Sequence, residues 1–418
     1  MAYLFNTSMQ SHVQSSYTKL PLLIKSVIFF TLAASLIQGN VLGFNVSGLC
    51  WVIPCILSAI ILSKRLPMVS FPTVIWLPWI LLLGFHLALD DKTTLDPAVS
   101  PLQRTFQVLT PILVGMASST YRPSAHVINR FISLLRIMSY ILMAGSIGLS
   151  FEQILANTPT GLAPQVMSAL LLAIVFANRF LFFKQSKDLV TSLMLALLPL
   201  LAITRTVLAV MLLVFPTAFA PISWIKRLLA IATISMLGVW IFYLPQIQHK
   251  MFYSGYGDLT DIFTTQDFAT TGRSSLWEVL FSEAQTKHWM GHGIGGAETA
   301  ARYLTGLAYP HNDWLLTYYD LGLLGVAIFL LSNVMMLKHG YSASKKSNQV
   351  DTKFLFCAGI SMFLPFMLVM WTDNVMVYSP FFGNLQYSIL GFAYGALRKG
   401  RGSRANLYQG LQGHANHF

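Results

Sequence analysis

Charged residues are scarce in this sequence. Asp, Glu, Lys and Arg together make up 10% of the 418 residues, and 55% of the residues are hydrophobic. Soluble domains carry roughly 25% charged residues, and a soluble globule of this size would need far more polar surface. The deficit excludes an ordinary soluble fold and indicates a protein for which lipid is much of the solvent.

Cysteine is also rare, and recognisable cofactor motifs are missing. Cys50, Cys55 and Cys357 lie in apolar stretches without the spacing of a metal site or a disulfide framework, so we expect small buried side chains. The Gly-rich stretch 291–296 has no Lys-Ser/Thr after it and no strand pattern before it. Its glycines favour a tight turn or a close approach to a substrate. The sequence therefore indicates no metal and no cofactor.

Long apolar runs, in contrast, are abundant. A membrane helix needs about 20 mainly apolar residues. Runs of this kind lie near 22–38, 41–62, 69–89, 103–119, 129–150, 163–183, 227–245, 311–337, 353–372 and 380–397. The stretch 189–220 is too long for one span, and we split it into two short helices at Arg205 because a charge at bilayer depth is costly. We expect an all-α polytopic membrane protein of about 12 transmembrane helices, with one large periplasmic loop that contains short helices.

The distribution of charge supports this count of spans. If the N-terminus is cytoplasmic, 20 of the 27 basic residues fall in cytoplasmic segments, whereas only Asp188 and Asp351 of the 15 acidic residues do. The net charge of +12 then reflects topology, and we expect no nucleic-acid partner. The first apolar run lacks a small-residue cleavage site, which indicates a retained span. Both termini are predicted to be cytoplasmic.

One connection between spans is far longer than the others, at roughly 65 residues. Long loops in compact folds usually carry function. We therefore divide the chain into an N-terminal bundle of about nine spans, a large periplasmic loop, three C-terminal spans and a basic cytoplasmic tail. These parts cover residues 1–244, 245–310, 311–397 and 398–418.

Three arginines on the predicted outer side are candidate anion ligands. Arg205 opens an apolar helix, where the helix dipole adds to its charge and its guanidinium can grip a phosphate or pyrophosphate. Arg273 precedes a pattern typical of an amphipathic helix and would lie in its first turn. Arg104 lies near the outer start of the fourth predicted span. The plainer interpretation of Arg205 is an arginine that snorkels to the interface or pairs with a carboxylate, and that of Arg273 is a solvated loop arginine.

A histidine and two acids complete the candidate chemistry. His311 follows Pro310, which fits a helix start, and a neutral imidazole at that position would accept a proton. The alternative is an interfacial histidine bonded to the backbone. Asp320 is an acid within a predicted span and should face protein or a cavity. Asp373, at the outer end of the eleventh span, would orient an acceptor sugar. Either acid is as well explained as a structural partner for an arginine.

These residues lie in motifs that recur in one family, and their order matches. The sequence resembles the O-antigen ligase and O-antigen polymerase superfamily of bacterial envelope glycosyltransferases, most strongly over residues 200–330. The resembling segments are the helix start around Arg205, Thr271-Gly272-Arg273 with Leu276-Trp277, the Gly-rich 290–295, His311-Asn312-Asp313-Trp314-Leu315 and 321–325. The acid before the last motif is often Glu in this family, and here it is Asp320.

The resemblance implies a metal-independent inverting transfer of a glycan from undecaprenyl diphosphate to a sugar hydroxyl. The site would face the periplasm from the bacterial inner membrane. Arg205 and Arg273, with Arg104 as a further candidate, would bind the diphosphate, and His311 would activate the acceptor hydroxyl. Support around the acceptor would come from Asn312, Asp313, Asp320 and Asp373. Physical chemistry agrees, because arginines stabilise the negative charge that grows on a departing diphosphate.

The sequence leaves the acceptor open. A polymerase would extend a lipid-linked repeat of O-antigen or exopolysaccharide, which we favour, and a ligase would transfer the glycan to lipid A–core. A transporter or flippase of lipid-linked sugars is the alternative from another class. Against it, the sequence shows no internal repeat, no pair of broken helices in matching halves and few acids inside the spans.

Overall fold

The computed structural model of the protein describes residues 19–37, 40–41, 44–89, 100–151, 162–202, 204–264, 273–306, 309–376 and 379–398. In these residues the chain is helical apart from a small antiparallel pair, β1 (Asn40–Val41) and β2 (Phe44–Asn45). The longer helices are α2 (Leu22–Leu36), α3 (Val46–Arg65), α4 (Leu77–Ala88), α5 (Pro101–Ser119), α6 (Ala125–Leu149), α8 (Ala163–Phe183), α9 (Ser186–Leu201), α10 (Arg205–Leu212), α11 (Trp224–Phe242), α14 (Arg273–Ala284), α15 (Gly296–Thr305), α16 (Asp313–Lys346), α17 (Val350–Ile360) and a final helix over 383–398. Shorter ones are η1 (Leu66–Met68), η2 (Thr73–Trp76), α12 (Pro245–Met251), α13 (Asp261–Thr264), η3 (Gln285–Lys287) and α18 (Phe363–Val369).

Several helices are long and apolar enough to cross a membrane. In the described part of the chain there are six such segments: Cys50–Met68, Ala125–Leu149, Pro164–Phe183, Trp224–Phe242, Asp313–Lys346 and Val350–Val369. Leu22–Leu36 and Thr73–Ala88 are shorter apolar helices. The all-helical, polytopic class is thus what the structure supports, whereas about 12 spans remain a prediction.

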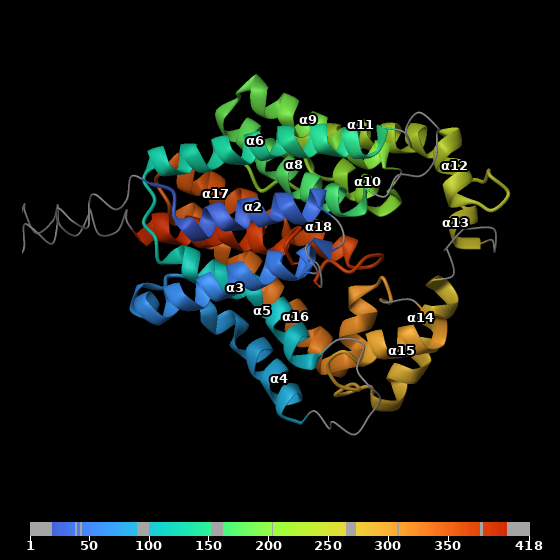
Figure 1. Ribbon diagram of the computed structural model, residues 1–418. Coiled ribbons are helices and arrows are strands. Elements are labelled where there is room, and N and C mark those ends of the chain that lie inside the picture. The colour runs from blue at the N-terminus through green and yellow to red at the C-terminus, as the bar shows by residue number, and fades with distance from the viewer. Residues whose placement is uncertain are drawn as a thin grey trace, which may run out of the picture.

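Helix α8 forms the centre of the bundle. Its residues are apolar on every face, which is the pattern of a helix surrounded by protein. Residues 166–177 are all buried, and α8 packs against α2, α6, α9, α10 and α17. In Figure 1 these helices run side by side, with α12 to α15 gathered beyond one end of the bundle. Helix α11 is the opposite case: most of its apolar side chains are exposed, which suits a lipid-facing helix.

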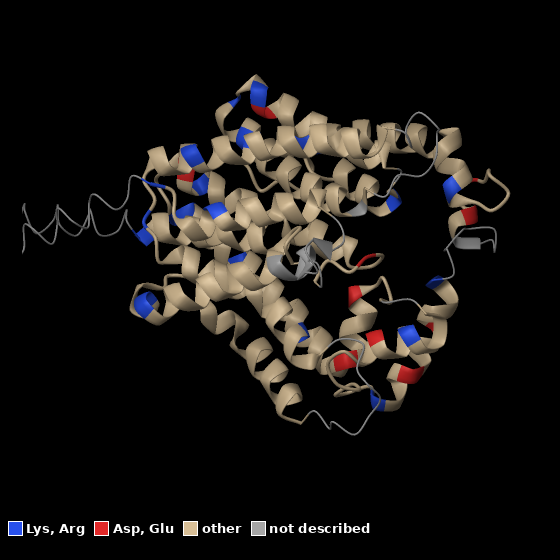
Figure 2. Cartoon of the chain, viewed as in Figure 1, with Lys and Arg blue, Asp and Glu red and all other residues tan. Residues whose placement is uncertain are grey.

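Charges of opposite sign gather at opposite ends of the molecule. Figure 2 shows most Lys and Arg at one end of the bundle, and most Asp and Glu near α14, α15 and the start of α16. We call these the basic end, which includes Arg65 and Lys346, and the acidic end, which includes Glu298 and Asp313. This separation fits the predicted sorting of charge across a membrane.

Some predicted spans are interrupted. The break predicted at Arg205 is confirmed, since α9 ends at Leu201 and α10 begins at Arg205. Helix α10 has only 8 residues, however, and the chain then turns until α11 begins. The predicted run 353–372 is two helices, α17 and α18, and the run 69–89 comprises η2 and α4. Apolar composition alone did not reveal these interruptions.

A kink in α16 fixes the Gly-rich loop at the acidic end. Gly322 has φ 67° and ψ −170°, which breaks the helix. The carbonyls of Tyr319 and Asp320 accept hydrogen bonds from His292 N (2.8 Å) and Gly293 N (2.9 Å). In return, Leu323 N and Leu324 N donate to the carbonyls of His288 (2.7 Å) and Trp289 (3.3 Å). The loop therefore replaces the backbone hydrogen bonds that the helix loses at its kink.

Two glycines make this exchange possible. A Cβ on Gly291 would overlap the backbone of Asp320, and a Cβ on Gly322 would overlap the backbone of Trp289. Both also have positive φ, at 74° and 67°. The structure shows the turn expected for the Gly-rich stretch, with positive φ at Gly291, Gly293 and Gly295, and a close approach to the chain's own backbone that was not expected.

Replacing Gly322 with alanine should destabilise the fold. The backbone conformation at Gly322 costs other residues about 1–3 kcal/mol, and the overlap with Trp289 adds to that. We expect Gly322→Ala to lower the thermal unfolding midpoint of the purified protein. Gly148→Ala is the matched control, because no atom lies near its Cβ position in α6 and alanine favours a helix. An unchanged midpoint for Gly322→Ala would contradict the assigned role of the kink.

Candidate functional site

The segment 372–374, just after α18, holds together parts of the chain that are distant in sequence. The Thr372 carbonyl accepts a hydrogen bond from Arg273 Nη1 (3.0 Å), and the Thr372 hydroxyl donates to Thr206 Oγ1 (2.5 Å). Two residues later, Asn374 Nδ2 lies 3.2 Å from His311 Nδ1. Consecutive Cα atoms are 3.8 Å apart, so the Cα atoms of Thr372 and Asn374 lie within about 7.6 Å of each other. The starts of α10, α14 and α16 therefore meet at this segment.

Three cations lie close together beside it. Arg205 is the first residue of α10, and its Nη1 donates to the carbonyl of Lys250 (3.3 Å). The pKa of Lys250 is lowered, first by burial and then by the positive charges of Arg205 and Arg273. Such mutual repulsion requires that the three charges lie near one another. The positive end of the α10 dipole adds to the same potential, so the arrangement favours an anion.

His311 lies at the edge of this cluster, outside the regular helix. Its φ is 52°, in the left-handed region, and its side chain is 29% exposed. Its Nδ1 lies 3.8 Å from Asp373 Oδ1 in addition to its contact with Asn374. Asn312 caps α16, with its side chain accepting a hydrogen bond from Leu315 N (3.0 Å). The helix cap thus fixes the backbone position of His311, the residue directly before Asn312.

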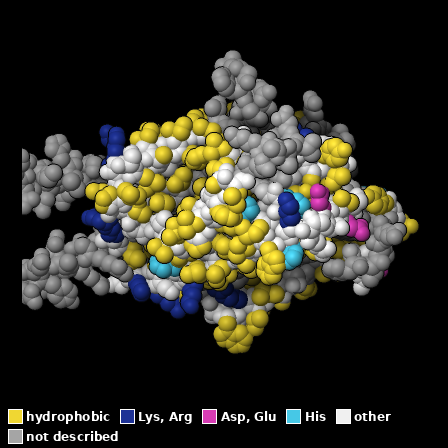
Figure 3. All heavy atoms as spheres, turned by 90° about the horizontal axis from the view of Figure 1, so that it is seen from below, with side chains coloured by type: hydrophobic (Ala, Val, Ile, Leu, Met, Phe, Trp, Pro, Cys, Tyr) yellow, Lys and Arg dark blue, Asp and Glu magenta, His cyan; other side chains and the backbone are white. Residues whose placement is uncertain are grey.

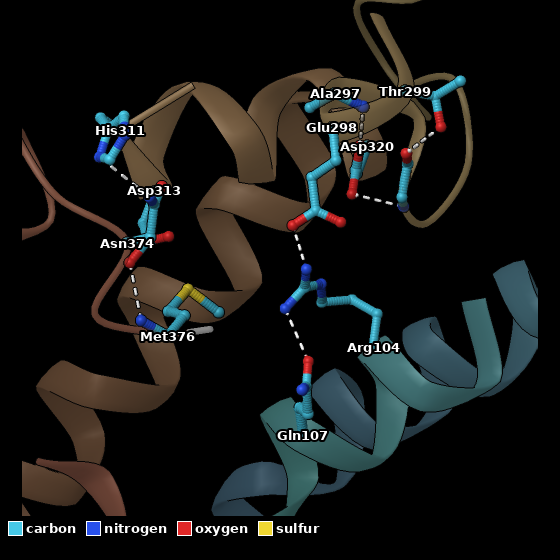
Figure 4. Close-up of polar contacts among 11 residues, drawn as sticks. Arg104, Gln107, Ala297, Glu298, Thr299, His311, Asp313, Asp320, Asn374 and Met376 are labelled. Atoms are coloured by element: carbon cyan, nitrogen blue, oxygen red, sulfur yellow. Dashed lines mark hydrogen bonds and ion pairs between the residues drawn. The ribbon is translucent and has the colours of Figure 1, made fainter. Parts of the chain in front are cut away.

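Asp313 anchors both ends of the segment that carries Thr372 and Asn374. Its backbone N donates to the carbonyl of Met370 (2.8 Å), and its Oδ2 accepts from Met376 N (2.7 Å). The side chain is fully buried. Figure 4 shows His311, Asp313, Asn374 and Met376 together at the start of α16. The arrangement gives Asp313 a positioning role and does not expose it to an acceptor.

Asp320 is likewise a structural anchor. Its Oδ2 and Oδ1 accept hydrogen bonds from Gly295 N and Ala297 N, both at 2.8 Å, at the start of α15. The side chain is buried in α16, directly before the kink. The structure therefore gives Asp320 a structural role. Its partners are backbone N–H groups at the start of α15 instead of an arginine.

Arg104 occupies a separate buried network. Its Nη2 forms an ion pair with Glu298 on α15, its Nη1 donates to Gln107 Oε1 (2.7 Å), and its guanidinium lies 5.8 Å from the centre of the Tyr309 ring. Burial raises the pKa of Glu298, while the charge of Arg104 acts in the opposite direction. Figure 4 shows this pair joining α5 to α15. Arg104 is therefore paired with a carboxylate inside the protein, and its contact with a diphosphate stays a prediction.

An apolar cavity of about 660 Å³ lies beside the first turns of α16. Its walls come mainly from α14 and α16 and include Trp277, Phe281, Trp314, Tyr318 and Trp371. Asn312, the neighbour of His311, also lines it. Cavities of this size and composition suit apolar chains or flat rings.

The structure thus brings some of the predicted residues together and separates others. Arg273 and His311 contact the segment 372–374, which includes Asp373, and Arg205 lies beside it through its neighbour Thr206, whereas Arg104 and Asp320 serve α15. Sequence reasoning missed four polar residues: Thr206, Lys250, Thr372 and Asn374. Their positions in the sequence could have indicated them. Thr206 follows Arg205, and Thr372 and Asn374 flank Asp373. Lys250 is one of the few basic residues of the large loop. In the described residues no group of three or more His, Cys, Asp or Glu side chains is arranged to hold a metal ion.

Comparison with known proteins identifies one family. Residues 154–330 match the family model described as O-antigen ligase. The matched range contains Arg205, Lys250, Arg273, His311 and Asp320 and ends before the segment 372–374. No curated protein matches the chain. The family resemblance of the sequence is therefore confirmed.

Binding of inorganic pyrophosphate should depend on the charge of Lys250. The pKa of Lys250 is lowered from the ordinary lysine value of 10.5, so Lys250 loses its proton at a lower pH than a free lysine does. Affinity for pyrophosphate should therefore fall as the pH rises toward 10.5. Loss of a hydrogen bond to a charged group costs about 1.5–3 kcal/mol, so Lys250→Met should weaken binding about tenfold or more and flatten this pH dependence. Lys287→Met, an exposed lysine of the same loop, is the control. Calorimetric titration that gives identical profiles for both variants would exclude this role.

Proposed function

We propose that this membrane protein, whose residues 154–330 belong to the O-antigen ligase family, is a metal-independent inverting glycosyltransferase. Its donor would be a glycan carried on undecaprenyl diphosphate, and its acceptor a sugar hydroxyl. The observation that carries the proposal is the convergence of Arg205, Lys250 and Arg273 beside His311. Cations for a leaving diphosphate and a base for an acceptor are the two things that this reaction requires.

In the proposed reaction, the bond between the anomeric carbon and the diphosphate oxygen breaks, and its electron pair stays with that oxygen. The three cations stabilise the negative charge that develops there. Both arginines are already held by backbone carbonyls, so they need little reorganisation as the charge appears. With enough positive potential from the protein, a metal ion is not required.

His311 is the proposed general base. It would take the proton of the acceptor hydroxyl while the acceptor oxygen bonds to the anomeric carbon, on the face opposite the departing diphosphate. The carboxylate of Asp373, 3.8 Å from Nδ1, would stabilise the imidazolium that forms. This leaves Nε2 as the atom that accepts the proton.

Asn374 fits the same tautomer once its amide is turned. Its Oδ1 is buried and has no hydrogen-bond partner among the described residues, while its Nδ2 lies beside His311 Nδ1. A half-turn of the amide exchanges the two atoms. Oδ1 would then accept the Nδ1 proton, and Nε2 would be kept available for the acceptor.

We assign the aromatic cavity to the acceptor side of the site. It borders His311 through Asn312, and none of its lining residues is one of the three cations. Trp277 also ties the cavity wall to the base, because its Nε1 donates to the carbonyl of Pro310 (2.6 Å), the residue before His311. A sugar ring on these aromatic faces would present its hydroxyl near the imidazole.

We further propose the topology that the charges favour. The basic end would lie in the cytoplasm with both termini, and the site would open to the periplasm at the bacterial inner membrane. In that arrangement residues 1–244 and 311–397 form the membrane bundle, 245–310 the periplasmic loop and 398–418 a cytoplasmic tail. The site then lies at the outer leaflet, where a lipid-linked donor would be presented.

Three substitutions test the mechanism. We expect Arg205→Ala and Arg273→Ala each to lower transfer about 10²–10³-fold, and His311→Ala to lower it about 10²–10⁴-fold. The assay would follow transfer from a lipid-linked donor by purified protein in nanodiscs, without added metal or nucleotide. Arg302→Ala, an exposed arginine in α15, is the control and should retain activity. Full activity in any two of the three variants would rule the mechanism out, and translocation without a glycosidic product would indicate a transporter.

The acceptor class follows from the phenotype of a deletion strain. For a polymerase acting on O-antigen or exopolysaccharide repeats, which we favour, we expect chains to shorten to a single repeat that is still attached to its acceptor. For a ligase that uses lipid A–core, long lipid-linked chains would accumulate and the core would be bare. Electrophoresis of the surface glycans separates these two patterns, because only the first lacks a ladder of chain lengths.

A further inference from the structure

A second cavity, of about 510 Å³, lies at the basic end of the bundle. It is formed by the turn after α3, the last turns of α16 and the final helix 383–398. Its lining residues include Ser70, His339, Ser342, Lys346, Tyr394 and Arg398. His339 is 17 residues beyond the kink at Gly322, which corresponds to about 25 Å of helix. The cavity is therefore separate from the proposed transfer site, and nothing in the proposed function uses it.

The polar groups of this cavity match an anion. Lys346 and Arg398 supply positive charge, and none of the described residues that line the cavity is acidic. Arg398 Nη1 donates to the carbonyl of Met68 (2.6 Å), which orients the guanidinium and leaves several of its five N–H donors for a ligand. A guanidinium held in this way is well suited to phosphate oxygens.

His339 adds a further donor. Its Nδ1 lies 2.7 Å from the hydroxyl of Tyr394. If this hydroxyl donates to Nδ1, the neutral imidazole carries its proton on Nε2 and offers an N–H to the cavity. The hydroxyls of Ser70 and Ser342 stand in the same wall.

The surroundings of the cavity indicate that its ligand has an apolar part. Two candidate membrane spans, Cys50–Met68 and Asp313–Lys346, end at the cavity, which places it at a membrane boundary. Leu66 and Met68, next to the cavity, are 60% and 48% exposed. Figure 3 shows a broad apolar surface with Lys and Arg gathered at one end. Acyl chains along this surface would bring a headgroup to the cations.

We propose that this cavity binds the phosphate-bearing headgroup of an anionic phospholipid. The phosphate would lie against Lys346, Arg398 and His339, and the acyl chains would lie along Leu66 and Met68. A basic pocket between membrane helices is a known physical basis for selecting anionic lipids. The bound lipid would join α3, α16 and the final helix at their ends.

Native mass spectrometry of the full chain tests the proposal. Protein released from vesicles of equal parts phosphatidylglycerol and phosphatidylethanolamine should retain phosphatidylglycerol at least tenfold in preference. The double variant Lys346→Gln/Arg398→Gln should lose this preference. Lys338→Gln/Lys345→Gln removes the same amount of charge, from α16 alone, and should keep the preference, because neither residue lines the cavity.

Several outcomes would overturn the proposal. They are equal retention of both lipids by the unmodified protein, or the same loss of preference in both double variants. Inorganic phosphate that binds as tightly as the lipid, and displaces it, would assign the cavity to a free anion instead. If the double variant unfolds, Lys346→Glu provides the same test, because it leaves the bond between Arg398 and Met68 intact. An unchanged preference in Lys346→Glu would also overturn the proposal.

Discussion

The carboxylate of Asp313, buried at the first turn of α16, is the constraint on which the candidate site depends. Through its Oδ2 and its backbone N–H it holds Met376 and Met370, the two ends of one short segment. That segment contains Thr372, Asp373 and Asn374, and it contacts Arg273, Thr206 and His311. A hydrogen bond contributes about 0.5–1.5 kcal/mol net, and the two bonds that Asp313 makes hold the segment at both of its ends. Asp313 therefore contributes to the chemistry by fixing positions.

The cations beside this segment are held against their own repulsion. Arg205 comes from α10, Lys250 from α12 and Arg273 from α14, and backbone carbonyls fix both arginines. Bringing like charges together costs free energy, and the binding of an anion would offset that cost. If the cations had to assemble around each substrate, their positioning would cost free energy in every catalytic cycle. The network of Arg104 and Glu298, away from the cations, has the different task of joining α5 to α15.

How far the sequence predicts this arrangement depends on the kind of interaction. Arg205 and Arg273 stand out because a charge beside an apolar run needs an explanation, and the helix that begins at Arg205 is observed. Thr372 is not predictable in this way, since its carbonyl contacts Arg273 and any residue has a carbonyl. The partner of Arg104 is 194 residues away in sequence, and no local pattern announces Glu298. The break between α17 and α18 was equally hidden, because both pieces are apolar.

The exchange of hydrogen bonds between the Gly-rich loop and the kinked helix uses main-chain atoms only. The side chains of His288 and Trp289 therefore take no part in anchoring the loop, although His288 lines the aromatic cavity and Trp289 is exposed. Substitutions at these two positions can alter what the loop displays without loosening its attachment. The fold thus separates the attachment of the loop from its outward surface, so that the residues displayed at positions 288 and 289 can change while the attachment is kept.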